Sequence, residues 1–219
     1  MISSLSLNCL LEQLVEDVLV LDEAAKTIGA LESEDLALSI MKGGTYFVLY
    51  DPLLIDQEDQ IEDNYDYIHG FIQIKHSSTC NSWIVSYVSA KKNYGPTMYD
   101  IAMSYIYPDF MRADTRYIST AARKIWNFMY THRANEFLME PISDLSTSLS
   151  CKAAEEDESK NQVRHKSIDY AYAIKNWINL SVLTANHSKF VKTSKLVKRD
   201  FEYKLRVGSS KMFNDSFEW

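Results

Sequence analysis

Glycine is scarce in this chain, with 6 residues among 219, and the glycine-rich patterns that hold phosphates are missing. Neither G-x-x-x-x-G-K-[ST] nor G-x-G-x-x-G occurs, which argues against the nucleotide-hydrolysing and dinucleotide-binding folds that carry them. The three cysteines lie far apart and form no C-x-x-C pair, so we expect neither a zinc site nor a disulfide framework. They are Cys9, Cys80 and Cys151.

Metal-ligand spacings and long apolar runs are also missing. The five histidines do not form H-E-x-x-H, and no Ser-His-Asp arrangement can be read from the sequence, so we expect no metal. No apolar run approaches the ~18 residues of a membrane span. Because Glu12, Glu16 and Asp17 interrupt the first 20 residues, a signal peptide is not expected either. Together with unpaired cysteines, these absences predict a cytoplasmic protein.

Charge is distributed unevenly along the chain, which has a net charge of −7. Acidic residues gather before position 66 and basic residues gather after position 189. The overall acidity argues against non-specific nucleic-acid binding as the main activity. The basic tail has two interpretations, a solvated helix face, which we favour, or a local site for an acidic partner or RNA.

Residues 83–106 predict a strand, a short turn and a helix. Positions 83–88 are β-branched and aromatic, as in a largely buried strand, and Pro96 suits the first position of a helix. Helical spacing continues through Met98, Ile101, Ala102 and Tyr105. The unpaired amides of the first helical turn, with Lys91 and Lys92 beside them, suit a phosphate or diphosphate. In the alternative interpretation, Gly95 only supplies a backbone angle and the corner binds nothing.

This turn resembles the acetyl-CoA-binding motif of the GNAT superfamily of N-acyltransferases, Q/R-x-x-G-x-G/A, which lies between a central strand and the next helix. The matching residues are Lys92, Asn93, Tyr94, Gly95, Pro96 and Thr97. Lys92 replaces the usual Gln or Arg. Thr97 replaces the second small residue, and its side chain crowds the place where the family requires close approach.

A closer resemblance is to GNAT-like proteins encoded by tailed bacteriophages, which carry a YGP-hydrophobic-YD signature. Here the signature is Tyr94-Gly95-Pro96 and Tyr99-Asp100. The subgroup also has an Asp-Arg element before a helix with Trp and Tyr, matched by Asp114, Thr115 and Arg116 and then by Trp126 and Tyr130. Residues 43–52 and 70–74 match its early strands. The resemblance is strongest over residues 45–133.

The resemblance implies an α+β fold in which a central mixed, mostly antiparallel sheet contains a splayed parallel strand pair and is flanked by helices. Residues 1–178 would form this domain, and residues 179–219 a helical C-terminal extension packed on it. Acetyl-CoA would be the cosubstrate, and its pantetheine arm would bind main chain exposed in the gap between the splayed strands.

The resemblance also implies roles for individual residues. Residues 92–97 would hold the diphosphate, and the main chain near Tyr87 or Val88 would polarise the thioester carbonyl. Tyr130 is the candidate acid for the departing thiolate. We slightly favour its alternative role as a core tyrosine whose hydroxyl binds water. The base is open between Asp114, Glu62 and a chain of waters.

The remaining elements follow from periodicity and turn residues. We expect helices over residues 5–19, 36–41 (capped near Ser33 and ended by Gly43 and Gly44), 96–107, 119–133 (capped by Ser119) and 180–205. We expect strands over residues 45–50, 67–75, 81–90, 110–113 and 168–174, with a hairpin at 76–79. Strand 110–113 should run parallel to strand 81–90, because helix 96–107 supplies the crossover. Residues 57–67 and 146–161 read as polar loops.

Two functions remain open at this point. The first is an acyltransferase acting on an amine of a host protein or small molecule. The second is a GNAT-like scaffold without turnover, acting by contact as a virion component or host-takeover factor. Thr97, the unnamed base and the apolar C-terminal segment, which could join two copies of the chain, favour the second function. We expect the protein in the host cytoplasm, with the virion as the other possible location.

Overall fold

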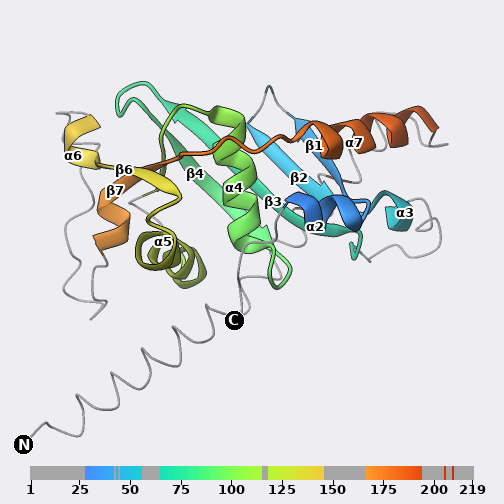
Figure 1. Cartoon of the computed structure of the whole chain (residues 1–219), viewed down its shortest axis with the longest axis horizontal. Helices are drawn as coiled ribbons and strands as arrows, with labels where there is room; N and C mark the ends of the chain where they lie inside the picture. The colour runs from blue at the N-terminus through green and yellow to red at the C-terminus, as the bar shows by residue number, and fades with distance from the viewer. Residues whose placement is uncertain are drawn as a thin grey trace, which may run out of the picture.

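The computed structural model describes residues 28–41, 43, 45–55, 65–114, 118–145 and 166–193, with residues 205 and 209. In this part the chain is an α+β fold built on one seven-stranded sheet, in the order β1-β2-β3-β4-β5-β7-β6 (Figure 1). The expected helix over 5–19, the loop over 146–161, most of the loop over 57–67 and the apolar C-terminal segment lie outside the described residues. None of the helices described is long and apolar enough to cross a bilayer.

The sheet is mixed and mostly antiparallel, as expected. Its strands are β1 Ala37–Met41, β2 Tyr46–Tyr50, β3 Ile68–Ser77, β4 Ser82–Ala90, β5 Met111–Ala113, β6 Phe137–Pro141 and β7 Tyr170–Ile174. Each neighbouring pair is antiparallel except β4 and β5, which are parallel. The predicted hairpin and the predicted parallel pair are both confirmed. Strand β6, in the stretch 136–150 that the sequence left unassigned, pairs with β7.

The described helices are α2 Ile28–Ser33, α3 Pro52–Ile55, α4 Gly95–Ile106, α5 Thr120–His132, α6 Ile142–Leu145 and α7 Ser181–Thr193, with a 3₁₀ turn, η4, over Lys166–Asp169. The expected helices over 96–107 and 119–133 are confirmed as α4 and α5. The Ser119 side chain accepts a hydrogen bond of 3.2 Å from the Ala122 amide, so it is the predicted N-cap. Helix α7 confirms the described part of the helix expected over 180–205.

The helix expected over residues 36–41 is wrong. Those residues form β1, and Ser33 is the last residue of α2, where its hydroxyl donates to the Ala30 carbonyl. Gly43, with φ of 65°, turns the chain so that β1 pairs with β2 from Met41↔Tyr46 to Ala37↔Tyr50. Pairing with a fully buried neighbouring strand outweighs the local preference, which short apolar runs leave ambiguous.

Helix α4 lies across one face of the sheet and forms the centre of the main core (Figure 1). It approaches β3 closely at Gly70, where a Cβ atom would lie 2.9 Å from Met98 Cγ and 3.1 Å from Ala90 Cβ. Helix α7 lies by β1, with Leu183 in the main core and Phe190 against the cluster that holds Tyr50 and Phe71. It therefore packs against an edge strand that would otherwise be open to pairing.

The expectation of unpaired cysteines is wrong for Cys80, which is disulfide-bonded. Cys80 is buried beside Ile142 at the turn between β3 and β4. Its sulfur accepts from Arg112 of β5 at 3.1 Å, and Arg112 Nε donates to Ser82 Oγ at 3.2 Å. Spacing along the sequence did not predict this bond, because a disulfide depends on tertiary contacts rather than on a local pattern.

Candidate functional site

The corner between β4 and α4 has the predicted strand–turn–helix form. The turn closes with a 3.0 Å hydrogen bond from the Tyr94 amide to the Lys91 carbonyl, and α4 begins at Gly95 with Pro96 in its first turn. The left-handed conformation in this turn belongs to Asn93, whose φ is 72°. Gly95 is not in that region, so the interpretation that it supplies a backbone angle is wrong. It supplies space, since a Cβ atom there would lie 3.1 Å from Ile125 Cδ1.

Side chains of the chain itself cover much of the first turn of α4. Tyr94, Pro96 and Thr97 are buried, and Thr97 is only 1% exposed. The Tyr94 hydroxyl donates to Glu34 Oε2 at 2.7 Å, and its ring lies edge-on to His69 with centroids 4.8 Å apart. A diphosphate would therefore have to approach this corner from the side of the remaining predicted residues. These are Lys92, which is exposed, and Asn93 and Gly95, which are half-buried.

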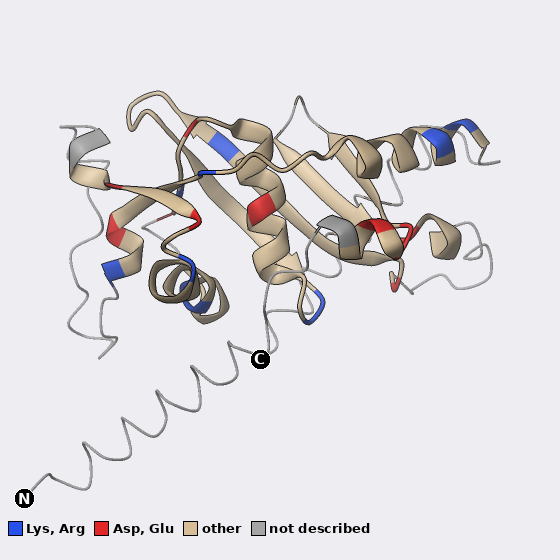
Figure 2. Ribbon diagram, viewed as in Figure 1, with Lys and Arg blue, Asp and Glu red and all other residues tan. Residues whose placement is uncertain are grey.

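One feature of the corner suits an anion and another does not. The Asn93 Oδ1 atom is buried and has no hydrogen-bond partner within the described residues. This oxygen accepts hydrogen bonds, so it needs a donor such as a water and does not itself favour an anion. Basic residues, which do favour an anion, lie on the turn before α4 and on α5, both on the lower side of the view in Figure 2. They are Lys91, Lys92, Arg123 and Lys124.

The parallel pair β4–β5 separates after a short contact. The two strands are paired at Trp83↔Met111, Ile84↔Arg112 and Val85↔Ala113, and β4 then continues to Ala90 with no described strand on that side. Ser86 is a bulge, because Gln73 of β3 pairs with Tyr87 whereas Ile74 pairs with Val85. Bulges bend a strand and change the direction of its groups. The predicted splayed pair is thus present, and its gap begins at Ser86.

Antiparallel pairing decides which main-chain groups face this gap. The Lys91 amide donates to the His69 carbonyl, and residues whose groups face a partner strand alternate along β4. The register therefore turns the amide of Tyr87 toward β3 and the amide of Val88 toward the gap. Of the two predicted donors, only Val88 has the required orientation. The side chain of Tyr87 is 49% exposed, whereas that of Val88 packs on the main core.

Tyr130 lies close to the point where the gap opens. Its ring is half-buried against the main core, with its centroid 5.5 Å from that of Tyr170 at the start of β7. Because Tyr172 pairs with Met111, the antiparallel register places Tyr170 level with Ala113, the last residue of β5. Strands are spaced by ~4.8 Å, so β7 is about 10 Å from β4. A molecule bound in the gap would lie within reach of this pair of tyrosines.

The candidate bases are less well defined. Asp114 follows β5 directly and is half-buried, and Glu62 lies outside the described residues. In the described part of the chain, no group of three or more His, Cys, Asp or Glu side chains could hold a metal ion.

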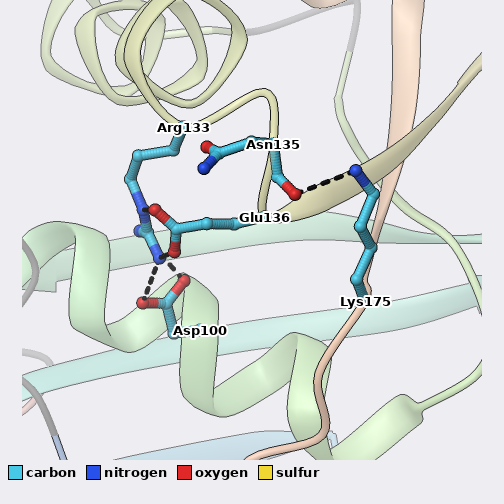
Figure 3. Close-up of polar contacts among 5 residues, drawn as sticks. All are labelled: Asp100, Arg133, Asn135, Glu136 and Lys175. Carbon is cyan, nitrogen blue, oxygen red and sulfur yellow. Dashed lines mark hydrogen bonds and ion pairs between the residues drawn. The ribbon is translucent and has the colours of Figure 1, made fainter.

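A partly buried ion cluster at the end of α5 was not predicted (Figure 3). Arg133 donates to both carboxylate oxygens of Asp100, at 3.1 and 3.0 Å, and to both oxygens of Glu136, at 3.1 and 2.7 Å. Burial raises the pKa of Asp100 to about 6, although the charge and hydrogen bonds of Arg133 oppose this shift. Burial opposes the charged form of Arg133 as well, yet its hydrogen bonds to Glu136 and Asp100 raise its pKa. The only signal in the sequence was the Tyr99-Asp100 pair of the signature, which gave no role.

No family model, curated protein or solved structure matches this chain.

Proposed function

We propose that this chain is an acetyl-CoA-dependent N-acyltransferase of the GNAT type, of bacteriophage origin, which acts in the cytoplasm on an amine of a host protein or small molecule. The observation that carries this proposal is the gap between β4 and β5, with the Val88 amide directed into it and α4 beginning at the end of β4. The family resemblance requires this combination, and its parts come from residues distant in sequence.

Acyl transfer in the gap would assign a task to each group. The amine nitrogen attacks the thioester carbonyl carbon, a C–N bond forms, and the C–S bond breaks. The Val88 amide would stabilise the negative charge that develops on the carbonyl oxygen. Tyr130 would give its proton to the departing thiolate, and the proton from the amine would pass to Asp114 or to water.

A binding role without turnover is the second candidate, and the burial of the α4 corner favours it. Thr97 is almost fully buried, and Glu34 brings a carboxylate to the residue that precedes the helix. Both features oppose a diphosphate at this corner. In that case the same scaffold would act by contact with a protein partner, in the host cytoplasm or in a virion. The disulfide of Cys80 is unusual for a reducing cytosol, so it fits a virion component better than a protein of the host cytoplasm.

Calorimetry with acetyl-CoA tests the proposal, and Val88→Pro is the informative variant. Proline lacks the amide that faces the gap, and Val88 does not use that amide to pair with β3. We expect the wild-type chain to bind acetyl-CoA, and Val88→Pro to weaken binding about tenfold, which is the loss of one hydrogen bond. Val88→Ala, which keeps the amide, should bind within about twofold of wild type.

If the wild-type chain gives no heat at high micromolar acetyl-CoA, the acyltransferase proposal is rejected and the binding role is favoured. If it binds, release of free thiol in the presence of candidate amines measures turnover. Tyr130→Phe should then lower kcat and leave the KM for acetyl-CoA nearly unchanged. The molar mass in solution tests whether the chain assembles with a second copy.

A further inference from the structure

Tyr99 and Asp100, the second half of the sequence signature, both face α5 rather than the corner before α4. The Tyr99 ring lies edge-on to Trp126, with centroids 5.1 Å apart, and Asp100 accepts the two hydrogen bonds from Arg133. These two contacts are two turns apart on α5, which is about 10 Å along its axis. Two contacts so far apart fix both the rotation and the position of α5 relative to α4.

We propose that Asp100 and Arg133 are positioning residues that hold Tyr130 at the opening of the β4–β5 gap. Tyr130 lies on α5 between Trp126 and Arg133, one helical turn before Arg133. Because a helix moves as a rigid unit over so short a distance, α5 cannot rotate about Trp126 without separating Arg133 from Asp100. The ion pair therefore sets the orientation of the helix face that carries Tyr130.

The same cluster also contacts the far end of β7, the strand that begins at Tyr170. The Arg133 guanidinium binds Glu136 and lies over the Phe137 ring at 5.0 Å, which ties the end of α5 to the start of β6. Lys175, which follows β7, donates from its side chain to the Asn135 carbonyl at 2.8 Å (Figure 3). Its amide donates to the Glu136 carbonyl at 2.9 Å. The end of α5 is thus tied to β6 and to the end of β7 opposite Tyr170.

The two ion pairs of the cluster, Arg133 with Asp100 and Arg133 with Glu136, differ in burial. This difference allows their effects on the position of α5 to be told apart. The Asp100 side chain is 8% exposed and that of Arg133 is 11% exposed, whereas that of Glu136 is 47% exposed. An exposed ion pair contributes little, because water screens it and competes for its hydrogen bonds. The buried ion pair of Arg133 with Asp100 should therefore position α5. Glu136→Gln, which removes only the exposed ion pair, is a matched control.

The role of Tyr130 in proton transfer rests on the proposed function. The claim that Asp100 and Arg133 hold Tyr130 in place does not. The test therefore begins with a readout that needs no substrate. We would place 3-fluorotyrosine at position 130 alone and record its ¹⁹F resonance in the full chain. The same label at Tyr105, an exposed residue near the end of α4, reports changes unrelated to α5.

Asp100→Asn keeps the shape of the side chain and removes its charge, so it should shift or split the resonance at position 130. Glu136→Gln should leave this resonance unchanged. The double variant Asp100→Leu with Arg133→Met removes both buried charges, and such apolar replacements usually fold. We expect it to remain folded and still to shift the resonance, which separates positioning from stability. The label at position 105 should not respond to any of these changes.

Turnover supplies the second readout if the chain acetylates an amine. Asp100→Asn and the double variant should lower kcat about 10- to 100-fold, because small displacements of a catalytic group have costs of this order. The KM for acetyl-CoA should stay within about twofold of wild type. Arg133→Lys, which keeps the charge but not the two-pronged geometry, should recover only part of the loss.

The inference is overturned if the resonance at position 130 is the same in the folded double variant as in wild type. It is also overturned if Glu136→Gln shifts the resonance as much as Asp100→Asn. If wild-type chain binds no acetyl-CoA but the resonance responds as expected, the proposed function fails and the positioning stands.

Discussion

Tyr94 donates a hydrogen bond of 2.7 Å to Glu34, and this contact joins the turn after α2 to the residue that precedes α4. It brings a carboxylate to the end of α4 whose helix dipole favours an anion. A negative charge in that place competes with a diphosphate for the same partial charge. The first prediction follows from this competition.

Glu34→Gln should strengthen acetyl-CoA binding about two- to fivefold, because it removes an exposed negative charge and keeps a hydrogen-bond acceptor for Tyr94. Calorimetry at low ionic strength measures the change. Glu32→Gln, which removes an equal charge on α2 itself, is the control and should have a smaller effect. An equal change in affinity in the two variants would show that the diphosphate of acetyl-CoA does not lie at the α4 corner.

Gly70 sets how closely α4 can approach the sheet. Gly70→Ala should lower the free energy of unfolding by about 1–3 kcal/mol, because the added Cβ would lie 2.9 Å from Met98 Cγ and 3.1 Å from Ala90 Cβ. Urea denaturation measures the loss. The Met98→Ala background should reduce the cost of Gly70→Ala, since it removes the nearest atoms. If the two losses simply add, Met98 is not the source of the strain.

Asp100 should make stability depend on pH in a direction opposite to that of most carboxylates. Its pKa is raised from 3.8 to about 6. The contribution of this shift to the free energy of unfolding is therefore complete below about pH 3.8 and is lost as the pH rises through about 6. The full change is about 3 kcal/mol, from a shift of about 2 pKa units. The free energy of unfolding of wild type, minus that of Asp100→Asn, should fall by up to this amount between pH 4 and pH 7. A rise over that interval would mean that Arg133 outweighs burial.

Asn93 and Gly95 should tolerate substitution differently from what their residue types suggest. Asn93→Val should lower the free energy of unfolding by about 1–2 kcal/mol, because a β-branched residue does not favour a φ of 72°. Asn93→Gly should be neutral or slightly stabilising. Gly95→Ala should cost less than about 1 kcal/mol, since its Cβ would meet only the end of the Ile125 side chain. Thermal denaturation of the three variants gives the order, and a larger cost at Gly95 than at Asn93 would contradict it.

The sequence by itself determined the local parts of this protein. It predicted the β3–β4 hairpin, the strand–turn–helix corner, the Ser119 cap and the parallel pairing of β5 with β4. Each depends on residues close in the chain, such as the periodicity of 98–105, or on a rule of connection, such as the crossover that a parallel pair requires.

Tertiary structure decided whatever depends on partners distant in the chain. Residues 36–41 form a strand because β2 is available to pair with them, although their local pattern also allows a helix. Asp100 meets Arg133, and Tyr130 meets Tyr170, only after α4, α5 and β7 have packed together. The direction of the Val88 amide depends on its register with β3. Such pairs leave no periodic pattern in the sequence, because packing and long-range pairing, rather than local preference, bring them together.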